Sequence, residues 1–260
     1  MQLKFSKYQG TGNDFILIDN REAIFPGDNT DLVSFLCDRR FGIGADGLIL
    51  LESDPTLDFK MVYYNSDGRQ STMCGNGGRC MVAFAKHLDL IADDTSFLAV
   101  DGRHEARIID DMVSLEMQDV SEIKEKQNSL FLNTGSPHHV QLVQNVKDMD
   151  VRKEGRKLRY GLYGQEGSNI NFVADTGEDS FYVRTYERGV EDETLSCGTG
   201  VTAVAIAMHR AGYTQKNKVR ITTPGGLLEV DFKFDGKGYH GIRLTGPAKL
   251  VFKGEVHVEA

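Results

Sequence analysis

Two cysteines, Cys74 and Cys197, each stand directly before a glycine and a stretch of helical composition. A cysteine just before a helix lies at the positive end of the helix dipole, which stabilises the thiolate and lowers the pKa of the thiol. The glycines that follow allow backbone N–H groups to approach a carboxylate or a phosphate. Each Cys-Gly-x-Gly element is therefore a candidate nucleophile, acid–base group or anion site.

Two such thiols could act on opposite faces of one small acid. Inversion at a carbon requires one group that removes the α-proton and another that delivers a proton to the other face. The negative charge that develops must be stabilised by oriented N–H donors, and acid–base groups work best when their pKa values lie near the working pH. We interpret Cys74 and Cys197 as such a pair, because their context occurs twice. For Cys37 and Cys80 we favour the alternative of inert, buried thiols.

Similar segments surround the two cysteines. The strand-like run 58–64 leads to Asn65 and then to Cys74, and the run 180–186 leads to Glu187 and then to Cys197. The cysteines lie 123 positions apart, close to half of the chain of 260 residues. This spacing indicates a duplication at the scale of a domain.

The elements that must position these residues are many short strands and few helices, which indicates an α+β fold. Helical spacing is expected at 31–40, 77–88, 148–158 and 199–211. We expect an N-terminal lobe over 1–118, joined by the last strand at 248–260, and a C-terminal lobe over 119–247.

Composition excludes several classes of protein. The net charge of −8 argues against a nucleic-acid binder that depends on phosphate contacts. The first residues are polar, and no apolar run approaches the length of about 18 residues that spans a bilayer. The four cysteines form neither a disulfide framework nor a zinc-ligand pattern. We therefore expect a reduced, cytoplasmic protein without a metal site.

Several motifs in a fixed order resemble those of the diaminopimelate epimerases. The resemblance extends from residue 3 to near the end of the chain. The motifs are GTGNDF at 10–15, GIGADG at 42–47, YNSDG at 64–68, CGNGGRC at 74–80, GSNINF at 167–172, ERG at 187–189 and CGTG at 197–200.

The resemblance implies a cofactor-independent enzyme that interconverts LL- and meso-diaminopimelate in lysine and peptidoglycan precursor synthesis. It implies two pseudo-symmetric lobes, each with a mixed or antiparallel sheet wrapped around a central helix, and an active site in the cleft between them. It makes a homodimer possible. It implies that the protein binds a small-molecule substrate and binds neither nucleic acid nor a membrane.

The resemblance also assigns residues. Cys74 and Cys197 are the thiol and thiolate pair. Arg188 can bind a carboxylate through two hydrogen bonds, and Glu187 can meet an ammonium group. The positions that match substrate-holding side chains are Asn13, Asn65, Asn169, Glu187 and Arg188, and those that match the backbone around the reacting carboxylate are Gly75, Asn76, Gly198 and Thr199.

Two positions depart from the family pattern. Many members carry Asn where this chain has Ser136 before Pro137-His138, and some carry Gln where Gly47 stands. We expect Ser136 and His138 near the site. For His138 we favour a packed, hydrogen-bonded histidine over a proton-transfer role.

Three other interpretations of these motifs compete with diaminopimelate epimerase. Proline racemases and hydroxyproline epimerases also use two cysteines, whereas phenazine-biosynthesis isomerases share the lobes without the pair. A thiol redox switch or a non-catalytic binding module is an alternative of a different class. The redox role is disfavoured because redox pairs usually lie close in sequence as CxxC. A dinucleotide site at Gly10-Thr11-Gly12 is rejected because the third glycine of that motif is absent.

Overall fold

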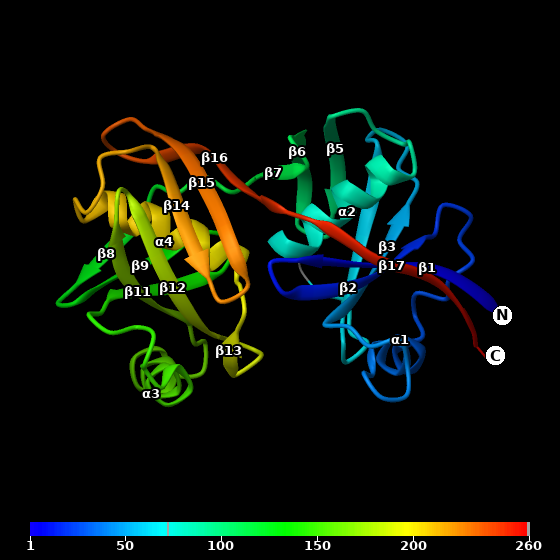
Figure 1. Ribbon diagram of the computed structural model, residues 1–260, viewed down its shortest axis with the longest axis horizontal. Helices are drawn as coiled ribbons and strands as arrows, with labels where there is room; N and C mark the ends of the chain where they lie inside the picture. Colours follow the sequence, from blue (N-terminus) through cyan, green and yellow to red (C-terminus); the bar gives the residue numbers. More distant parts are fainter. Residues whose placement is uncertain (72, 259–260) are drawn as a thin grey trace. The chain divides into compact units, whose positions relative to one another are not determined.

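The computed structural model describes residues 1–71 and 73–258, and the chain divides into two compact units (Figure 1). The first unit comprises Met1–Leu115 and Gly246–Ala260, and the second comprises Glu116–Thr245. Strands outnumber helices in the described residues, which confirms the expected α+β class with a mixed sheet. In those residues, no helix is long and apolar enough to cross a membrane.

The first unit is a mixed sheet around one buried helix. Strand β1 is antiparallel to β2 and β17, β2 is parallel to β3, β3 is antiparallel to β4, β4 is parallel to β5, and β5, β6 and β7 follow antiparallel. The elements are β1 (Gln2–Gly10), β2 (Asn13–Asp19), α1 (Thr30–Cys37), β3 (Gly47–Glu52), β4 (Phe59–Asn65), α2 (Gly75–His87), β5 (Asp94–Ala99), β6 (Gly102–Ile109), β7 (Met112–Glu116) and β17 (Lys249–His257).

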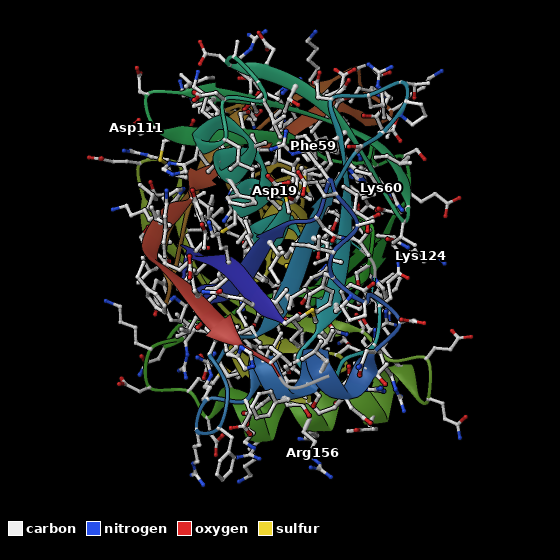
Figure 2. All side chains as sticks on the ribbon, turned by 90° about the vertical axis from the view of Figure 1, so that its right-hand side faces the viewer. Asp19, Phe59, Lys60, Asp111, Lys124 and Arg156 are labelled. Atoms are coloured by element: carbon white, nitrogen blue, oxygen red, sulfur yellow. The ribbon has the colours of Figure 1, made fainter. Side chains whose placement is uncertain are left out.

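Helix α2 is buried on nearly all sides, and it packs against β1, β2, β3, β4, β6 and β17. The strands alternate between core and surface, as a pleated sheet requires. On β4, for example, Phe59 is fully buried, whereas the next residue, Lys60, is not; both are labelled in Figure 2. Lys60 pairs with Glu52 at 3.0 Å. The buried faces of these strands therefore pack around α2.

The second unit repeats this plan. Strand β8 is antiparallel to β9, β9 is antiparallel to β10, β10 is parallel to β11, β11 is antiparallel to β12, β12 is parallel to β14, and β14 and β15 are antiparallel. The elements are β8 (Ile123–Lys126), β9 (Ser129–Asn133), β10 (Pro137–Leu142), α3 (Val151–Tyr163), β11 (Asn169–Gly177), β12 (Ser180–Glu187), β13 (Asp192–Thr194), α4 (Gly198–Arg210), β14 (Lys218–Thr223), β15 (Gly226–Phe234) and β16 (Tyr239–Pro247).

Within its own unit, α4 takes the place that α2 takes in the first. It is buried on nearly all sides and packs against β9, β10, β11, β12, β14 and β15. The second unit's other helix, α3, is amphipathic, and its Arg156 extends into solvent (Figure 2). The parallel and antiparallel pairings follow in the same order in both units, from β17 and β8 onward.

The expected helices are present, with differences in the bounds of α3 and α1. The helix expected over 148–158 extends from Val151 to Tyr163 as α3, because Asp150 caps it by accepting from Lys153 N at 3.0 Å. Helical spacing was expected to reach Arg40, but α1 ends at Cys37 because Asp38 adopts an extended backbone with ψ of 128°. The Asp38 carboxylate then accepts hydrogen bonds from the backbone N–H groups of Arg40 and Phe41, both at 2.7 Å. This local hydrogen bonding replaces the next turn of helix.

Candidate active site

Both predicted cysteines occupy the N-cap position of a buried helix. Cys74 caps α2 and Cys197 caps α4, each with extended backbone, and both helices have 13 residues. The Cys74 carbonyl accepts from Gly78 N at 2.7 Å, and the Cys197 carbonyl accepts from Val201 N at 2.9 Å. Each thiol thus lies at the positive end of a helix dipole, where the thiolate is stabilised.

Gly200, in the first turn of α4 near the Cys197 thiol, has no room for a side chain. A Cβ atom at Gly200 would lie 2.7 Å from Asn171 Oδ1 and 3.4 Å from Cys197 Sγ. Any larger residue would therefore push against both the amide and the thiol. The glycine lets Asn171 pack directly against the first turn of α4.

The turn before Asn13 is a tight hairpin. Gly10 pairs with Asn13, and the two residues between them, Thr11 and Gly12, have φ of 51° and 95°. Two positive φ values are typical of the type I′ turn that matches the twist of a hairpin. A β-branched residue is uncommon in this conformation, and the Thr11 hydroxyl is held by Arg79 Nη2 at 3.2 Å.

A chain of hydrogen bonds connects Asn13 to the first turn of α2. Arg79 Nη2 lies 2.9 Å from the Asn76 amide, and because arginine only donates, that atom is Oδ1. Asn76 Nδ2 therefore donates to Asn13 Oδ1, and Asn13 Nδ2 donates to Asp46 Oδ2 at 2.9 Å. We call Cys74, Asn76, Arg79, Asn13 and Asp46 the Cys74 cluster.

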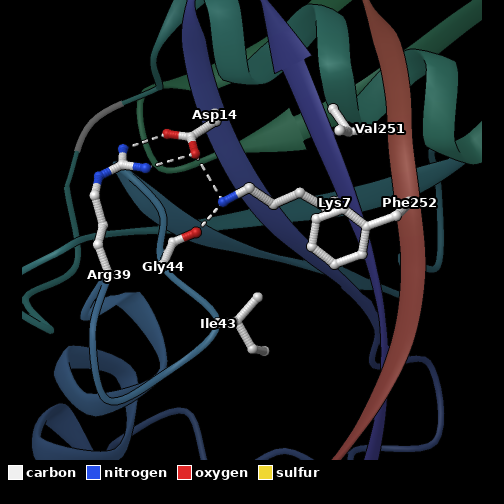
Figure 3. A pocket seen from close by; sticks show the side chains of 7 residues that line it. All are labelled: Lys7, Asp14, Arg39, Ile43, Gly44, Val251 and Phe252. Atoms are coloured by element: carbon white, nitrogen blue, oxygen red, sulfur yellow. Dashed lines mark hydrogen bonds and ion pairs between the residues drawn. The ribbon is translucent and has the colours of Figure 1, made fainter.

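Charged side chains anchor the Asp46 end of the Cys74 cluster. Arg39 bonds Asp46 at 2.8 Å. It also bonds Asp14 at 2.6 Å (Figure 3). The buried Lys7 ammonium lies 2.8 Å from Asp14 and donates to the Gly44 carbonyl. Burial would raise the pKa of Asp14, but the hydrogen bonds and charges of Arg39 and Lys7 outweigh it and lower this pKa to about 2.

Asn65 and Gly47 lie in one row of the sheet, where Phe15 pairs with Gly47 and Gly47 pairs with Asn65. Asn65 is exposed at the end of β4, and its carbonyl closes a turn with Gly68 N at 2.9 Å. A Cβ at Gly47 would lie 2.5 Å from both the Tyr63 ring and the Tyr64 carbonyl. Tyr63 therefore fills the space that the Gln of other family members would need.

In the second unit, Asn169 brings together three of the predicted binding residues. Its Nδ2 donates to Ser136 Oγ at 3.0 Å and to the Pro137 carbonyl at 3.1 Å, and its Oδ1 accepts from Arg188 N at 2.9 Å. The Arg188 side chain is exposed and donates to the Glu166 carbonyl at 2.9 Å. Serine at position 136 thus still serves as a hydrogen-bond acceptor for Asn169.

Glu187 lies at the end of β12, directly before Arg188, and is half-buried. The Thr194 hydroxyl donates to Glu187 Oε2 at 2.8 Å. This bond, from strand β13 to the end of β12, orients the carboxylate.

Beside Cys197, hydrogen bonds determine the tautomer of a buried histidine. Asn171 lies 2.9 Å from the His139 carbonyl, which only accepts, so this amide atom is Nδ2. The same Nδ2 lies 3.2 Å from His138 Nδ1, which must therefore accept. His138 thus carries its proton on Nε2 and donates it to Thr199 Oγ1 at 2.9 Å.

The Thr199 hydroxyl lies 3.5 Å from Cys197 Sγ, so it can donate to a Cys197 thiolate or accept from a Cys197 thiol. Burial, with the charge of Arg188 added, lowers the pKa of His138 to about 3, so the imidazole is neutral. This placement agrees with the expected hydrogen-bonded histidine. We call Cys197, Thr199, His138 and Asn171 the Cys197 cluster.

The other two cysteines are packed in the core. Burial raises the pKa of Cys37 to about 12 and that of Cys80 to about 12. Both thiols are therefore protonated at neutral pH, as their expected packing role requires. Among the described residues, no group of three or more His, Cys, Asp or Glu side chains is arranged to hold a metal ion.

Sequence reasoning missed Arg79, Asp46 and Asn171. Arg79 and Asp46 lie inside motifs that were noted for their glycines and cysteines, at 74–80 and 42–47. Asn171 lies two residues after Asn169 on the same strand, and that alternation signals a shared face.

Comparisons with known proteins agree with these motifs. The family model described as diaminopimelate epimerase matches residues 5–121 and 130–251. A diaminopimelate epimerase of Flavobacterium psychrophilum is 61% identical over 253 residues, which cover 96% of this chain and 99% of the relative. One of Chlorobaculum tepidum is 42% identical over 258 residues, which cover 95% and 98%.

Solved structures show the same fold at low identity. A Bacillus anthracis protein of the PhzF phenazine-biosynthesis family superposes with a TM-score of 0.79 at 13% identity, with 99% of this chain and 100% of that chain covered. A hydroxyproline epimerase of Agrobacterium vitis superposes with a TM-score of 0.67 at 15% identity, with 98% and 92% covered.

Proposed function

Because this chain belongs to the diaminopimelate epimerase family, we propose that it inverts one α-carbon of diaminopimelate with Cys74 and Cys197 as the two bases. The chain is an amino-acid epimerase of lysine biosynthesis. The mechanism rests on one observation, the placement of each cysteine at the N-cap of a buried helix in a unit of the same strand order. Such a placement favours a thiolate.

In the proposed step, the thiolate of one cysteine takes the α-hydrogen as a proton. The electron pair of the broken C–H bond moves into the carboxylate and forms an enediolate. The thiol of the other cysteine then gives its proton to the opposite face of the carbon. After one turnover the two cysteines have exchanged protonation states, and the proton balance is complete.

The backbone N–H groups of the two helix starts are proposed to hold the reacting carboxylate. They belong to Gly75 and Asn76 at α2 and to Gly198 and Thr199 at α4. Because the charge on this carboxylate increases in the enediolate, fixed N–H donors stabilise the transition state more than the bound substrate. The glycines allow the close approach that such contacts need.

The remaining predicted residues are proposed to bind the other amino-acid end of the substrate. Arg188 would pair with its carboxylate and Glu187 with its ammonium group. The amides of Asn13, Asn65 and Asn169 would add directional hydrogen bonds, with Ser136 holding Asn169 and His138 holding Thr199. A substrate with two amino-acid ends suits this set better than proline, which has one.

The proposed chemistry requires reduced thiols. Cys37 and Cys80 are free thiols in the core. A disulfide at either catalytic position would remove the base, so we place the enzyme in the reducing cytoplasm. The homodimer expected from the family stays a prediction.

The test is incubation of the reduced protein with LL-diaminopimelate in heavy water. We expect the meso isomer to form with one deuterium at the inverted carbon. Cys74→Ala and Cys197→Ala should each lower the rate of inversion by about 10²–10⁴-fold, the usual contribution of a general acid or base.

Two controls make this test specific. Cys37→Ala, at a buried thiol of the core, should retain inversion activity. Proline and hydroxyproline, offered as substrates in heavy water, should gain no deuterium. Full inversion by either variant, Cys74→Ala or Cys197→Ala, would contradict the two-base mechanism.

A further inference from the structure

Arg79 is a buried cation without a buried anion. Its side chain is fully buried on α2, and it donates to the Gly75 carbonyl at 3.3 Å, to Thr11 Oγ1 at 3.2 Å and to Asn76 Oδ1 at 2.9 Å. Its Nε has no hydrogen-bond partner, and no described carboxylate lies within ion-pair distance of the guanidinium. Burial of an unpaired charge is costly, so this arginine needs an explanation beyond packing.

The groups that can compensate the positive charge of Arg79 are thiols. Burial lowers the pKa of Arg79, and the neighbouring Cys80 and Cys74 act in the opposite direction. Cys80 is itself fully buried, and its raised pKa of about 12 keeps it neutral. Cys74 is half-buried at the start of α2, directly before the Gly75 carbonyl that Arg79 contacts. Of the two thiols, Cys74 is the one at the N-cap of α2, where the helix dipole stabilises a negative charge.

The second unit has no such cation at the corresponding place. Arg79 is the fifth residue after Cys74, and the fifth residue after Cys197 is Thr202. Both side chains reach back to the residue that follows the cysteine, since Thr202 Oγ1 donates to the Gly198 carbonyl at 3.0 Å. The two helices share this contact and differ by one buried positive charge, because Arg188, whose charge acts on His138 in the second unit, is exposed.

We propose that Arg79 is a positioning residue that holds Cys74 as the thiolate in the free enzyme, while Cys197 rests as the thiol. The inference rests on the proposed function of the two cysteines and adds an order to it. The resting enzyme then accepts the stereoisomer whose α-hydrogen faces Cys74. The reverse reaction must start from the less populated form, in which the proton has moved to Cys74.

Which of the two cysteines has the lower pKa is tested without substrate. Cys197→Ser leaves Cys74 as the reactive thiol, and Cys74→Ser leaves Cys197. The rate of alkylation by iodoacetamide, followed against pH, gives the pKa of each. We expect Cys74 to titrate at the lower pH. The double variant supplies the background from Cys37 and Cys80, whose burial should keep it low.

Variants at position 79 test the cause. In the Cys197→Ser background, Arg79→Met should raise the pKa of Cys74 by about 1–3 units, the range that a nearby opposite charge produces. Arg79→Lys keeps the charge and should restore most of the shift, although it loses the forked hydrogen bonds. Thr202→Val, the matched change in α4, should leave the pKa of Cys74 unchanged.

Thermal melting and circular dichroism show whether each variant is folded. If Arg79→Met does not fold, Arg79→Lys and the comparison of the two thiols still decide the question. A Cys74 pKa equal to or above that of Cys197, or one that Arg79→Met leaves in place in a folded protein, would overturn the proposal. Since alkylation needs no substrate, this outcome is separate from a failure of the deuterium experiment.

Discussion

His138 donates from its Nε2 to the hydroxyl oxygen of Thr199 over 2.9 Å. The same hydroxyl lies 3.5 Å from Cys197 Sγ, and it can donate to that sulfur when the sulfur is a thiolate. A charged sulfur gains more from such a donor than a neutral one does. A neutral histidine thus helps the cysteine without taking a proton itself.

The first prediction concerns that hydroxyl. Thr199→Val keeps the shape and removes the donor, so the Cys197 thiolate loses one hydrogen bond to a charged group, worth about 1.5–3 kcal/mol. We expect inversion to slow by about 10–100-fold. Thr199→Ser should retain most of the activity. Equal rates for the Val and Ser variants would show that the hydroxyl plays no part.

The second prediction concerns pH and stability. The folded protein binds the proton of His138 only near pH 3, whereas an unfolded histidine binds it near pH 6.5. Between these values the unfolded state binds more protons, so stability falls as the pH falls. This group contributes a loss of up to about 1.4 kcal/mol per pH unit.

Urea unfolding at pH 7 and pH 5 measures this dependence. His138→Gln removes the titrating group, and its free energy of unfolding should decrease less between the two pH values than that of the unaltered protein. Burial also lowers the pKa of His139 and of His209. The pH dependence of the free energy of unfolding of the unaltered protein therefore includes these two histidines as well as His138. The same slope with and without His138 would contradict its assignment as a neutral buried group.

The third prediction concerns the support of Asn13. Asp46 accepts from Asn13 Nδ2 and from Arg39, so Asp46→Asn weakens the support of the Asn13 amide, which keeps its bond from Asn76. If Asn13 binds the substrate, KM should rise several-fold while kcat changes little, because the thiols are untouched. Asp54→Asn, in an exposed turn of the same unit, is the control. A loss confined to kcat would remove Asn13 from substrate binding.

The fourth prediction concerns glycine in the first turn of α4. Gly200→Ala places a methyl group 2.7 Å from Asn171 Oδ1, which must move and release His138. Activity and melting temperature should both decrease. Gly161→Ala is the matched helical control, because its Cβ would meet nothing within 4 Å. That change should stabilise α3 by up to about 1 kcal/mol.

The sequence predicted the features that depend on neighbours along the chain. Glycine after each cysteine, followed by an apolar run, indicated the helices that begin at Gly75 and Gly198. Neighbouring residues determine where a helix begins, so a helix N-terminus can be predicted from the sequence before the fold is known.

Contacts between distant segments could not be derived in this way. Asn171 meets His138 only because β10 and β11 pair in parallel with His138 opposite Asn169. A shift of that register by one residue would turn Asn171 to the other face. Arg79 and Asp46 were overlooked for the same reason, since Asn13 and Asn76 connect them through two different elements.

The pairing of β17 with β1 has a consequence for synthesis of the chain. Leu3 lies opposite Val256, so β1 keeps an open edge until β17 has been synthesised. The first unit therefore completes its sheet only after the second unit has been made. During that interval β1 is exposed to other nascent chains, and a ribosome that stalls before residue 249 would release a protein prone to aggregation.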